Sequence, residues 1–186
     1  MSAALVTPAA AQLPAYIAAL ERGWSPDNVR GKAAADEQLV KIAADPDGFL
    51  AAMDDPDARA GPIPLPDGTV AERLPGFHRW IWDGEFCGSI SLRWRKGTED
   101  LPPTCLGHIG YAVVPWKQGR GHATAALSRL LPCARETGLR WVDLTTNPDN
   151  IPSQRVIQSN GGVLIGPFDK PDVFGGGTGL LWRIVF

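Results

Sequence analysis

The chain has 186 residues, 44% of which are apolar, and its formal net charge is −2. This length predicts one domain, and the apolar fraction is enough for a hydrophobic core, which argues against a disordered chain. Acidic and basic residues nearly balance, so the charge gives no reason to expect a nucleic-acid partner. The composition therefore predicts a compact protein that binds a small molecule or another protein.

The N-terminal stretch and the cysteines indicate in which cellular compartment the protein is expected. Residues 1–20 carry no charged side chain, but they lack the basic start and the compact apolar run of a signal sequence. Alanine is frequent there and prolines interrupt the stretch, so we expect a loose start rather than a membrane-spanning helix. Three cysteines without a CxxC spacing and three scattered histidines argue against a disulfide framework and a metal site. We expect a cytoplasmic protein with no metal and no membrane partner.

The first 76 residues predict two helices followed by a long loop. Apolar residues at helical spacing indicate a helix over Leu13–Arg22, and a second is expected over Ala33–Ala44. Residues 45–48, Asp-Pro-Asp-Gly, are typical of a turn. Residues 54–76 are rich in proline and glycine, so we expect a loop there with at most one short strand.

The middle of the chain predicts three strands. Phe77–Trp82 and Glu85–Trp94 are apolar and aromatic, and the Asp-Gly pair between them suits a type I′ turn, so a hairpin is expected. A polar loop over residues 96–104 follows. Gly107–Val114 is expected to form the third strand.

A helix and a further strand come next. Gly121–Thr137 carries leucines on one face and predicts a helix, which Pro132 is expected to kink or shorten. Leu139–Thr146 is expected to be a buried strand. Strand, helix and strand in succession form a right-handed βαβ unit, so the strands on either side of this helix should be parallel.

The last part of the chain completes the expected fold. Asn150 is a suitable N-cap for a helix that ends near Asn160, and strands are expected over Val163–Pro167 and Leu180–Phe186. The order of elements predicts an α+β fold. Its sheet is mixed and mostly antiparallel, with a central βαβ unit and N-terminal helices. We treat residues 1–186 as a single domain.

The residues that point to chemistry lie between the third strand and the helix that follows. Gly119 and Gly121 stand at the start of that helix, where unpaired backbone N–H groups favour an anion and the missing Cβ atoms allow it to approach. Arg120 adds a positive charge. A tight turn without a ligand would explain two glycines equally well, and neither a GxGxxG nor a Walker A pattern is present.

This segment resembles a known family. Residues 118–123, Gln-Gly-Arg-Gly-His-Ala, are similar to the Q/R-x-x-G-x-G/A signature of the Gcn5-related N-acetyltransferases (GNAT). Downstream, residues 150–153 followed by the glycines at 161 and 162 are similar to a second segment of that family. The resemblance implies that residues 77–186 form an acetyl-CoA-binding core, and that residues 1–76 form the side that receives the acetyl acceptor.

The resemblance also implies how acetyl-CoA would bind. Its pyrophosphate would contact backbone N–H groups at the helix start, and its pantetheine arm would pair with the preceding strand like an added strand. The implied cofactor contacts are Tyr111, Val113, Val114, Gln118, Gly119, Arg120, Gly121, His122, Ala123, Thr124, Asn150 and Ser153. Two of these, Asn150 and Ser153, are equally ordinary residues for a helix start.

Catalysis in such a family needs a neutral amine, a donor for the oxyanion and a path for the thiolate to leave. The backbone N–H near Tyr111 is the implied oxyanion donor. His108 is the candidate base, since its pKa suits proton transfer near neutral pH, although a strand histidine can also be purely structural. The tyrosine that often serves as the acid in this family is replaced by Ile157, so Ser153, a water molecule or no group at all would protonate the thiolate.

The expected function is therefore that of an N-acetyltransferase. It would move an acetyl group from acetyl-CoA to a primary amine of a small molecule or peptide, with no nucleic-acid partner. A non-catalytic acyl-CoA-binding sensor is the alternative, and it is supported by the isoleucine at position 157, where the family often has a catalytic tyrosine. An unrelated α+β binding protein with a structural glycine turn, and assembly into a homodimer, both stay open.

Overall fold

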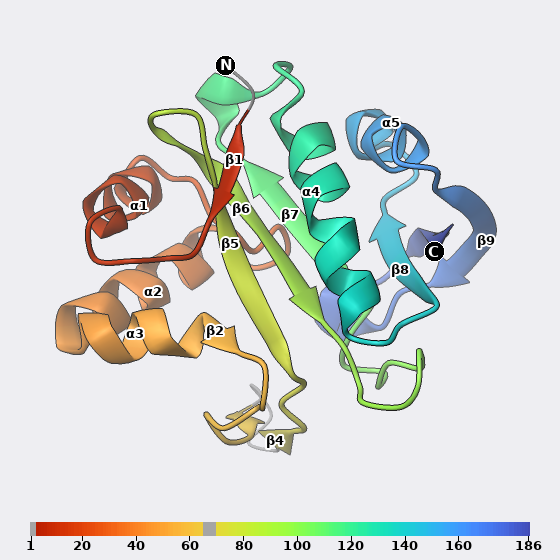
Figure 1. Ribbon diagram of the computed structural model, residues 1–186, viewed down its shortest axis with the longest axis horizontal. Coiled ribbons are helices and arrows are strands. Elements are labelled where there is room, and N and C mark those ends of the chain that lie inside the picture. Colours follow the sequence, from red (N-terminus) through yellow and green to blue (C-terminus); the bar gives the residue numbers. More distant parts are fainter. Residues whose placement is uncertain (1–2, 65–69) are drawn as a thin grey trace.

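The computed structural model describes residues 3–64 and 70–186, and its strands form two larger antiparallel sheets (Figure 1). In the first sheet the order is β1-β5-β6-β7, and β2 also pairs with β5. Its strands are β1 (Ala4–Val6), β2 (Asp54–Asp55), β5 (Gly76–Trp82), β6 (Phe86–Arg93) and β7 (Ile109–Val113). The second sheet has the order β8-β10-β9, with β8 (Trp141–Thr146), β9 (Val163–Asp169) and β10 (Thr178–Val185). A small hairpin joins β3 (Ile63–Pro64) to β4 (Val70–Ala71).

The helices cover both faces of the first sheet. On one side lie α1 (Leu13–Glu21), α2 (Lys32–Ala44) and α3 (Pro46–Ala52), and on the other side lies α4 (His122–Glu136), whereas α5 (Ile151–Gln158) lies beside α4 and β8 of the second sheet (Figure 1). Short 3-10 helices span Pro115–Lys117 and Asp172–Phe174. None of the helices in the described ranges is both long and apolar enough to cross a membrane.

The two sheets meet at β7 and β8, which flank α4 in the chain. Both strands point in roughly the same direction (Figure 1), as expected for a βαβ unit. The backbone N–H of His108, just before β7, donates to the carbonyl oxygen of Asp143 in β8 at 2.8 Å. Beyond this point the strands separate, and each continues in its own sheet. The expected α+β fold with a mostly antiparallel arrangement is confirmed.

Alternating side chains of the central strands supply two hydrophobic cores. Ile90 and Leu92 of β6 pack with α4 and the second sheet, whereas Trp80 of β5 packs on the opposite face. On that face Tyr16 of α1 stacks on Trp80 with ring centroids 4.8 Å apart, and neither residue is exposed to solvent. The N-terminal helices therefore share a core with the strands.

Local structure departs from expectation at the start of α3. Residues 45–48 were expected to form a turn, but Asp45 is the N-cap of α3 and its Oδ1 accepts the Gly48 N–H at 2.9 Å. The prediction was wrong because an aspartate before a proline also begins a helix, with Pro46 in the first turn. The first residues include strand β1 instead of only a loose start, and the proline-rich segment contributes three short strands instead of at most one.

The turn between β5 and β6 also differs from the prediction. Trp82 pairs with Phe86, so three residues form the loop. Gly84 has a φ of +114°, but Asp83 does not have a positive φ, which excludes a type I′ turn. The pairing register shifts between Ile81 and Trp82, so a bulge ends the strand. Pro132 lies inside α4, which nevertheless continues to Glu136 and is not shortened.

Replacing Tyr16 should test the contribution of the second core. Tyr16→Ala removes a fully buried ring that touches Trp80 and Phe86, so the free energy of unfolding should fall by about 3–5 kcal/mol. Tyr16→Phe loses only the hydrogen bond to Gln38 and should cost about 1 kcal/mol. Urea denaturation measures both changes, and equal losses would contradict the packing argument.

Candidate functional site

The loop that precedes α4 has the geometry of an anion site. Gly119 and Gly121 have φ values of +74° and +76°, and a Cβ built on either would meet no atom within 4 Å. Residues 118–121 are exposed. The N-cap Gly121 makes no side-chain cap bond, and the first turn of this 15-residue helix holds no acidic residue. The first N–H groups of α4 and its partial positive charge are therefore accessible to an anion.

The edge of β7 that faces β8 offers further backbone groups. In the antiparallel ladder with β6, the Val114 N–H donates to Cys87 and the Arg93 N–H donates to His108. Because successive residues alternate in direction, the backbone N–H and C=O groups of Tyr111 and Val113 point away from β6. They face the gap where the two sheets part.

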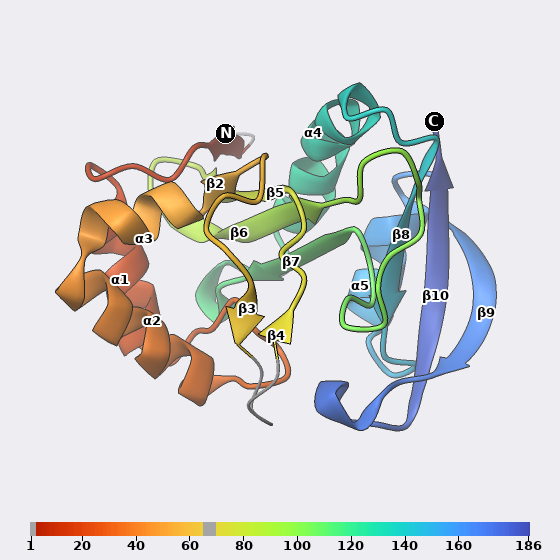
Figure 2. The same cartoon turned by 90° about the horizontal axis from the view of Figure 1, so that it is seen from below.

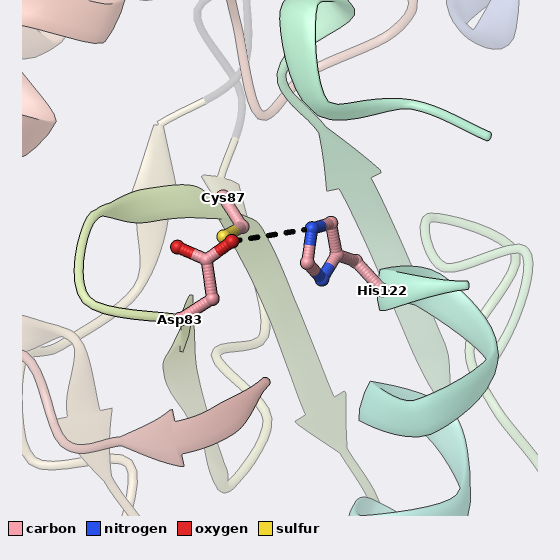
Figure 3. A group of neighbouring side chains, drawn as sticks. All are labelled: Asp83, Cys87 and His122. Carbon is pink, nitrogen blue, oxygen red and sulfur yellow. Dashed lines mark ion pairs between the residues drawn. The ribbon is translucent and has the colours of Figure 1, made fainter. Parts of the chain in front are cut away.

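A polar cluster around Asp83 connects this loop to the β5–β6 turn, and Figure 3 shows Asp83 and His122 of this cluster. Lys117, at the end of the short 3-10 helix, is buried, and its Nζ lies 2.6 Å from Oδ1 of Asp83 and 2.9 Å from Glu85. The other carboxylate oxygen of Asp83 lies 3.5 Å from Nε2 of His122, the first residue of α4. The hydrogen bond from Lys117 holds the pKa of Asp83 at about 2, so the carboxylate is ionised. Both ends of the glycine loop are thus fixed to the same aspartate.

This cluster also contains donors that could hold a metal ion. Single ligand atoms of Asp83, Cys87 and His122 lie within 4.8 Å of one another (Figure 3). The Lys117 ammonium already provides a positive charge next to Asp83, and burial raises the pKa of the Cys87 thiol to about 11, which keeps it protonated. The expectation that no metal binds stays a prediction.

The start of α5 is connected to β7 by a side chain. The Tyr111 hydroxyl donates to the backbone oxygen of Ser153 at 3.2 Å, and burial raises the pKa of this tyrosine to about 12. Asn150 accepts the Ser153 N–H with its Oδ1 at 3.2 Å, as an N-cap does. The side-chain oxygen of Asn150 is thus engaged in capping α5, while Ser153 is half-buried.

His108 stands where the two sheets join. It is fully buried, and its Nδ1 accepts the backbone N–H of Asp143 at 2.9 Å. Its Nε2 is buried and has no partner among the described residues. Burial lowers the pKa of His108, so the ring is neutral, and with Nδ1 as an acceptor the proton lies on Nε2. To accept a second proton, Nδ1 would first have to release Asp143.

The structure brings together most of the residues singled out in the sequence. Gln118 donates from Nε2 to the Val113 carbonyl at 3.2 Å, and this bond connects the glycine loop to the end of β7. Arg120 is exposed in that loop, and Ala123 and Thr124 lie in the first turn of α4. Val114 is fully buried, and its backbone is also engaged, since its N–H donates to Cys87 and its carbonyl accepts the Lys117 N–H at 3.0 Å.

Sequence reasoning missed the aspartate–lysine cluster. Asp83 entered the prediction only as the aspartate of the Asp-Gly turn, Lys117 was not singled out, and 34 positions separate the two residues. No periodic signal connects two such residues. The polar residues of β6 are a different case, since Ser89, Ser91 and Arg93 alternate with apolar residues in the sequence. That alternation in a central strand could have indicated a functional face.

The fold and site together define a mixed α+β protein with an exposed helix N-terminus beside a split sheet, and comparisons with known proteins agree. A family model described as an acetyltransferase (GNAT) domain matches residues 29–163. The chain therefore belongs to the GNAT acetyltransferase family, and it is an acyltransferase. Comparison with curated proteins gave no match.

Several solved structures share the fold. A ribosomal L7/L12 alpha-N-protein acetyltransferase, RimL, in complex with coenzyme A matches with a TM-score of 0.65 at 14% identity, covering 100% of this chain and 95% of that one. A microcin C7 self-immunity acetyltransferase, MccE, with acetyl-CoA and AMP gives 0.62 at 13% identity, over 100% and 93%. The aminoglycoside acetyltransferase AAC(6')-Ib with coenzyme A gives 0.59 at 14% identity, over 99% and 95%.

Removing the charge of Asp83 should destabilise the fold. Asp83→Asn removes the buried carboxylate and leaves the buried ammonium with only the exposed Glu85 as a counterion, so the free energy of unfolding should fall by about 3 kcal/mol at neutral pH. Because the folded pKa of Asp83 is lowered, the difference from wild type should persist above about pH 4 and shrink as the pH falls towards 2.

Glu85→Gln is the matched control for this prediction. Glu85 pairs with the same ammonium, but its side chain is 79% exposed, so its loss should cost less than about 1 kcal/mol. Urea denaturation between pH 3 and 7 compares the two variants. If Glu85→Gln lowers the free energy of unfolding as much as Asp83→Asn does, Asp83 is not the main partner of the Lys117 ammonium.

Proposed function

We propose that this protein is an N-acetyltransferase that uses acetyl-CoA and acetylates a primary amine of a small molecule or peptide in the cytoplasm. The observation that carries the proposal is the exposed start of α4 at the end of β7, whose outer edge pairs with no other strand in the described ranges. Membership of the GNAT family and the coenzyme A complexes of structures with the same fold support acetyl-CoA as the donor.

Residues 118–124 would bind the pyrophosphate. The backbone N–H groups from Gln118 to Thr124 lie at the positive end of the α4 dipole, where a charged phosphate is favoured. Arg120 can reach the same anion from an exposed position. Lys117 contributes no free charge, since Asp83 and Glu85 neutralise it. The His122 ring, fixed near Asp83, would position the first turn rather than touch the phosphates.

The pantetheine arm would lie along β7 in the gap between the sheets. Its amide groups can pair with the outward N–H and C=O groups of Tyr111 and with the N–H of Val113, in the manner of an added strand, while the Val113 carbonyl already accepts from Gln118. Asn150 and Ser153 stand at the start of α5, which Tyr111 holds near this edge. The thioester carbonyl would then approach the Tyr111 N–H, which would stabilise the oxyanion.

The reaction requires only groups that this arrangement supplies. The neutral amine nitrogen of the acceptor attacks the thioester carbon, a C–N bond forms, and the C–S bond breaks as its electron pair leaves with the thiolate. The amine loses one proton to a base or to water, and the thiolate gains one from the Ser153 hydroxyl or from water. Ile157, buried in α5, has no proton to give.

His108 is proposed as the base under one condition. Its neutral ring at the junction of β7 and β8 can accept a proton only if Nδ1 exchanges the Asp143 N–H for that proton. The same contact gives His108 a positioning role, because it fixes the point from which the two sheets separate. The two roles differ in their dependence on pH.

Calorimetric titration with acetyl-CoA, with NAD as the control ligand, tests the cofactor site. Gly121→Asp places a carboxylate against the pyrophosphate and should weaken acetyl-CoA binding by about 100-fold or more. Gly121→Asn has nearly the same size and tolerates a positive φ, but it carries no charge, so it should bind much closer to wild type. If both variants bind like wild type, the phosphate site lies elsewhere.

Measuring the release of coenzyme A separates the enzyme from a non-catalytic sensor. Turnover with any primary amine removes the sensor alternative, whereas binding of acetyl-CoA without turnover across a broad amine panel favours it. Chromatographic detection of the acetylated product avoids interference from the exposed thiol of Cys133.

The pH dependence of the rate tests His108. If it is the base, both His108→Ala and His108→Asn should lower kcat mainly below the pKa of the acceptor amine, at pH values where the wild-type ring is neutral, and remove the limb that reports the titration of His108. That limb should lie below the ordinary histidine pKa of about 6.5, because burial lowers the pKa of His108. An unchanged pH–rate profile in His108→Asn, whose side-chain oxygen can still accept the Asp143 N–H, would leave only the positioning role.

A further inference from the structure

A cavity of about 230 Å³ lies on the face of the first sheet that points away from α4. The β3–β4 hairpin lies on this side of the sheet (Figure 2). The walls come from β2 to β6 and from the loop around residues 102–105. Its charged and polar lining residues include Asp55, Glu72, Arg73, His78, Ser91 and Arg93. The space suits a small molecule rather than a protein surface.

The carboxylates of the cavity wall already have partners. Both oxygens of Asp55 accept backbone N–H groups, those of Arg59 at 2.7 Å and Ala60 at 3.0 Å. Glu72 pairs with Arg95 at 2.7 Å. The negative charges in the wall are therefore engaged by the protein itself.

Arg93 is different. It is partly buried, and within the described residues its guanidinium has neither a hydrogen bond nor an ion pair. His78 cannot serve as a counterion, since an imidazole is either neutral or positively charged, and burial and the charge of Arg93 lower its pKa to about 4, so it is neutral at pH 7. An arginine stays charged in a protein, and a partly buried charge without a counterion is unfavourable. An anionic ligand would remove this cost, and a carboxylate matches the guanidinium with two parallel hydrogen bonds.

The position of Arg93 connects the cavity to the proposed reaction site. His78, Ser91 and Gly110 lie opposite one another on three adjacent strands, so they form one row on this face. A Cβ on Gly110 would lie 3.2 Å from Nη2 of Arg93, so the guanidinium lies directly over this glycine. Gly110 precedes Tyr111, whose N–H is the proposed oxyanion donor. A molecule held by Arg93 would therefore present its other end near the thioester.

We propose that Arg93 binds a carboxylate of the acetyl acceptor, so that the substrate is a small primary amine with a carboxylate close to its amino group, as in a free amino acid. This inference rests on the proposed acetyltransferase function and names the substrate class for it. The acceptor carboxylate lies on the guanidinium, and the amine lies over the Gly110–Tyr111 segment.

The test compares kcat/KM for amines with and without the carboxylate. The probes are glycine, β-alanine, leucine, glutamate and phenylalanine, the corresponding amides, and phosphoethanolamine. The ratio of kcat/KM for acids to that for amides should be higher in wild type than in Arg93→Gln. Arg93→Gln should lower kcat/KM for the acids by about 10- to 100-fold and leave the amides within about threefold. Arg93→Lys keeps the charge but not the two parallel donors of the guanidinium, so its kcat/KM for the acids should lie between those of wild type and Arg93→Gln.

Lys96→Gln is the matched control, since it removes one positive charge from an exposed position a few residues away. It should leave the ratio of acids to amides as in wild type. Each comparison between variants uses the same substrate, so the amine's own pKa cancels. An equal loss for acids and amides in Arg93→Gln overturns the proposal. A preference for phosphoethanolamine that depends on Arg93 also overturns it, in favour of a phosphate.

Calorimetry keeps the test independent of turnover. The same acids and amides are titrated into wild type and Arg93→Gln, with acetyl-CoA titrated separately. Acids that bind wild type at least tenfold more tightly than Arg93→Gln support the carboxylate site even if no product forms. If acetyl-CoA fails to bind, the acetyltransferase function fails on its own. If acetyl-CoA binds and none of the acids binds in an Arg93-dependent way, only the substrate class is wrong.

Discussion

The separation of β7 from β8 is the constraint on which the rest of the site depends. His108 bonds to Asp143 through both its backbone and its ring, and after that contact the strands diverge. A continuous sheet would use the outward backbone groups of Tyr111 in a ladder, and no extended ligand could pair with them. The split costs the sheet these hydrogen bonds, and a ligand that aligns with β7 restores them. The two sheets, rather than a pocket in either one, thus create the proposed cofactor site.

The charges near the glycine loop show why the anion site depends mainly on backbone groups. A buried lysine next to a phosphate loop would be the obvious partner for a phosphate. Here the Lys117 ammonium lies 2.6 Å from Asp83, and it serves to hold the loop against the β5–β6 turn. Rigid placement of the α4 N-terminus then provides aligned N–H groups, whose attraction for an anion needs no flexible side chain.

Local sequence rules predicted much of the fold but few of the side-chain contacts between residues that are distant in the sequence. The hairpin, α4 and the N-cap at Asn150 follow from turn residues, periodicity and capping preferences that act within a few residues. The helix start at Asp45 was mistaken for a turn because both use the same residues. The contact of Lys117 with Asp83 and the position of Arg93 over Gly110 depend on how distant strands register, and no short window of sequence contains that information.

The two faces of β6 show where the acceptor side lies. A central strand with both faces covered is usually apolar throughout, since each polar group buried in it must be satisfied. In β6, Ile90 and Leu92 face α4, whereas Ser89, Ser91 and Arg93 face the other way. Ser89 is only 5% exposed, and the Ser91 hydroxyl donates to the Gly110 carbonyl at 3.4 Å. This face of β6 therefore buries polar side chains where apolar ones would pack better. Packing alone does not account for a row of small polar residues that ends in an arginine whose guanidinium has no partner in the part of the chain that the structure describes, whereas a polar ligand held above Gly110 does.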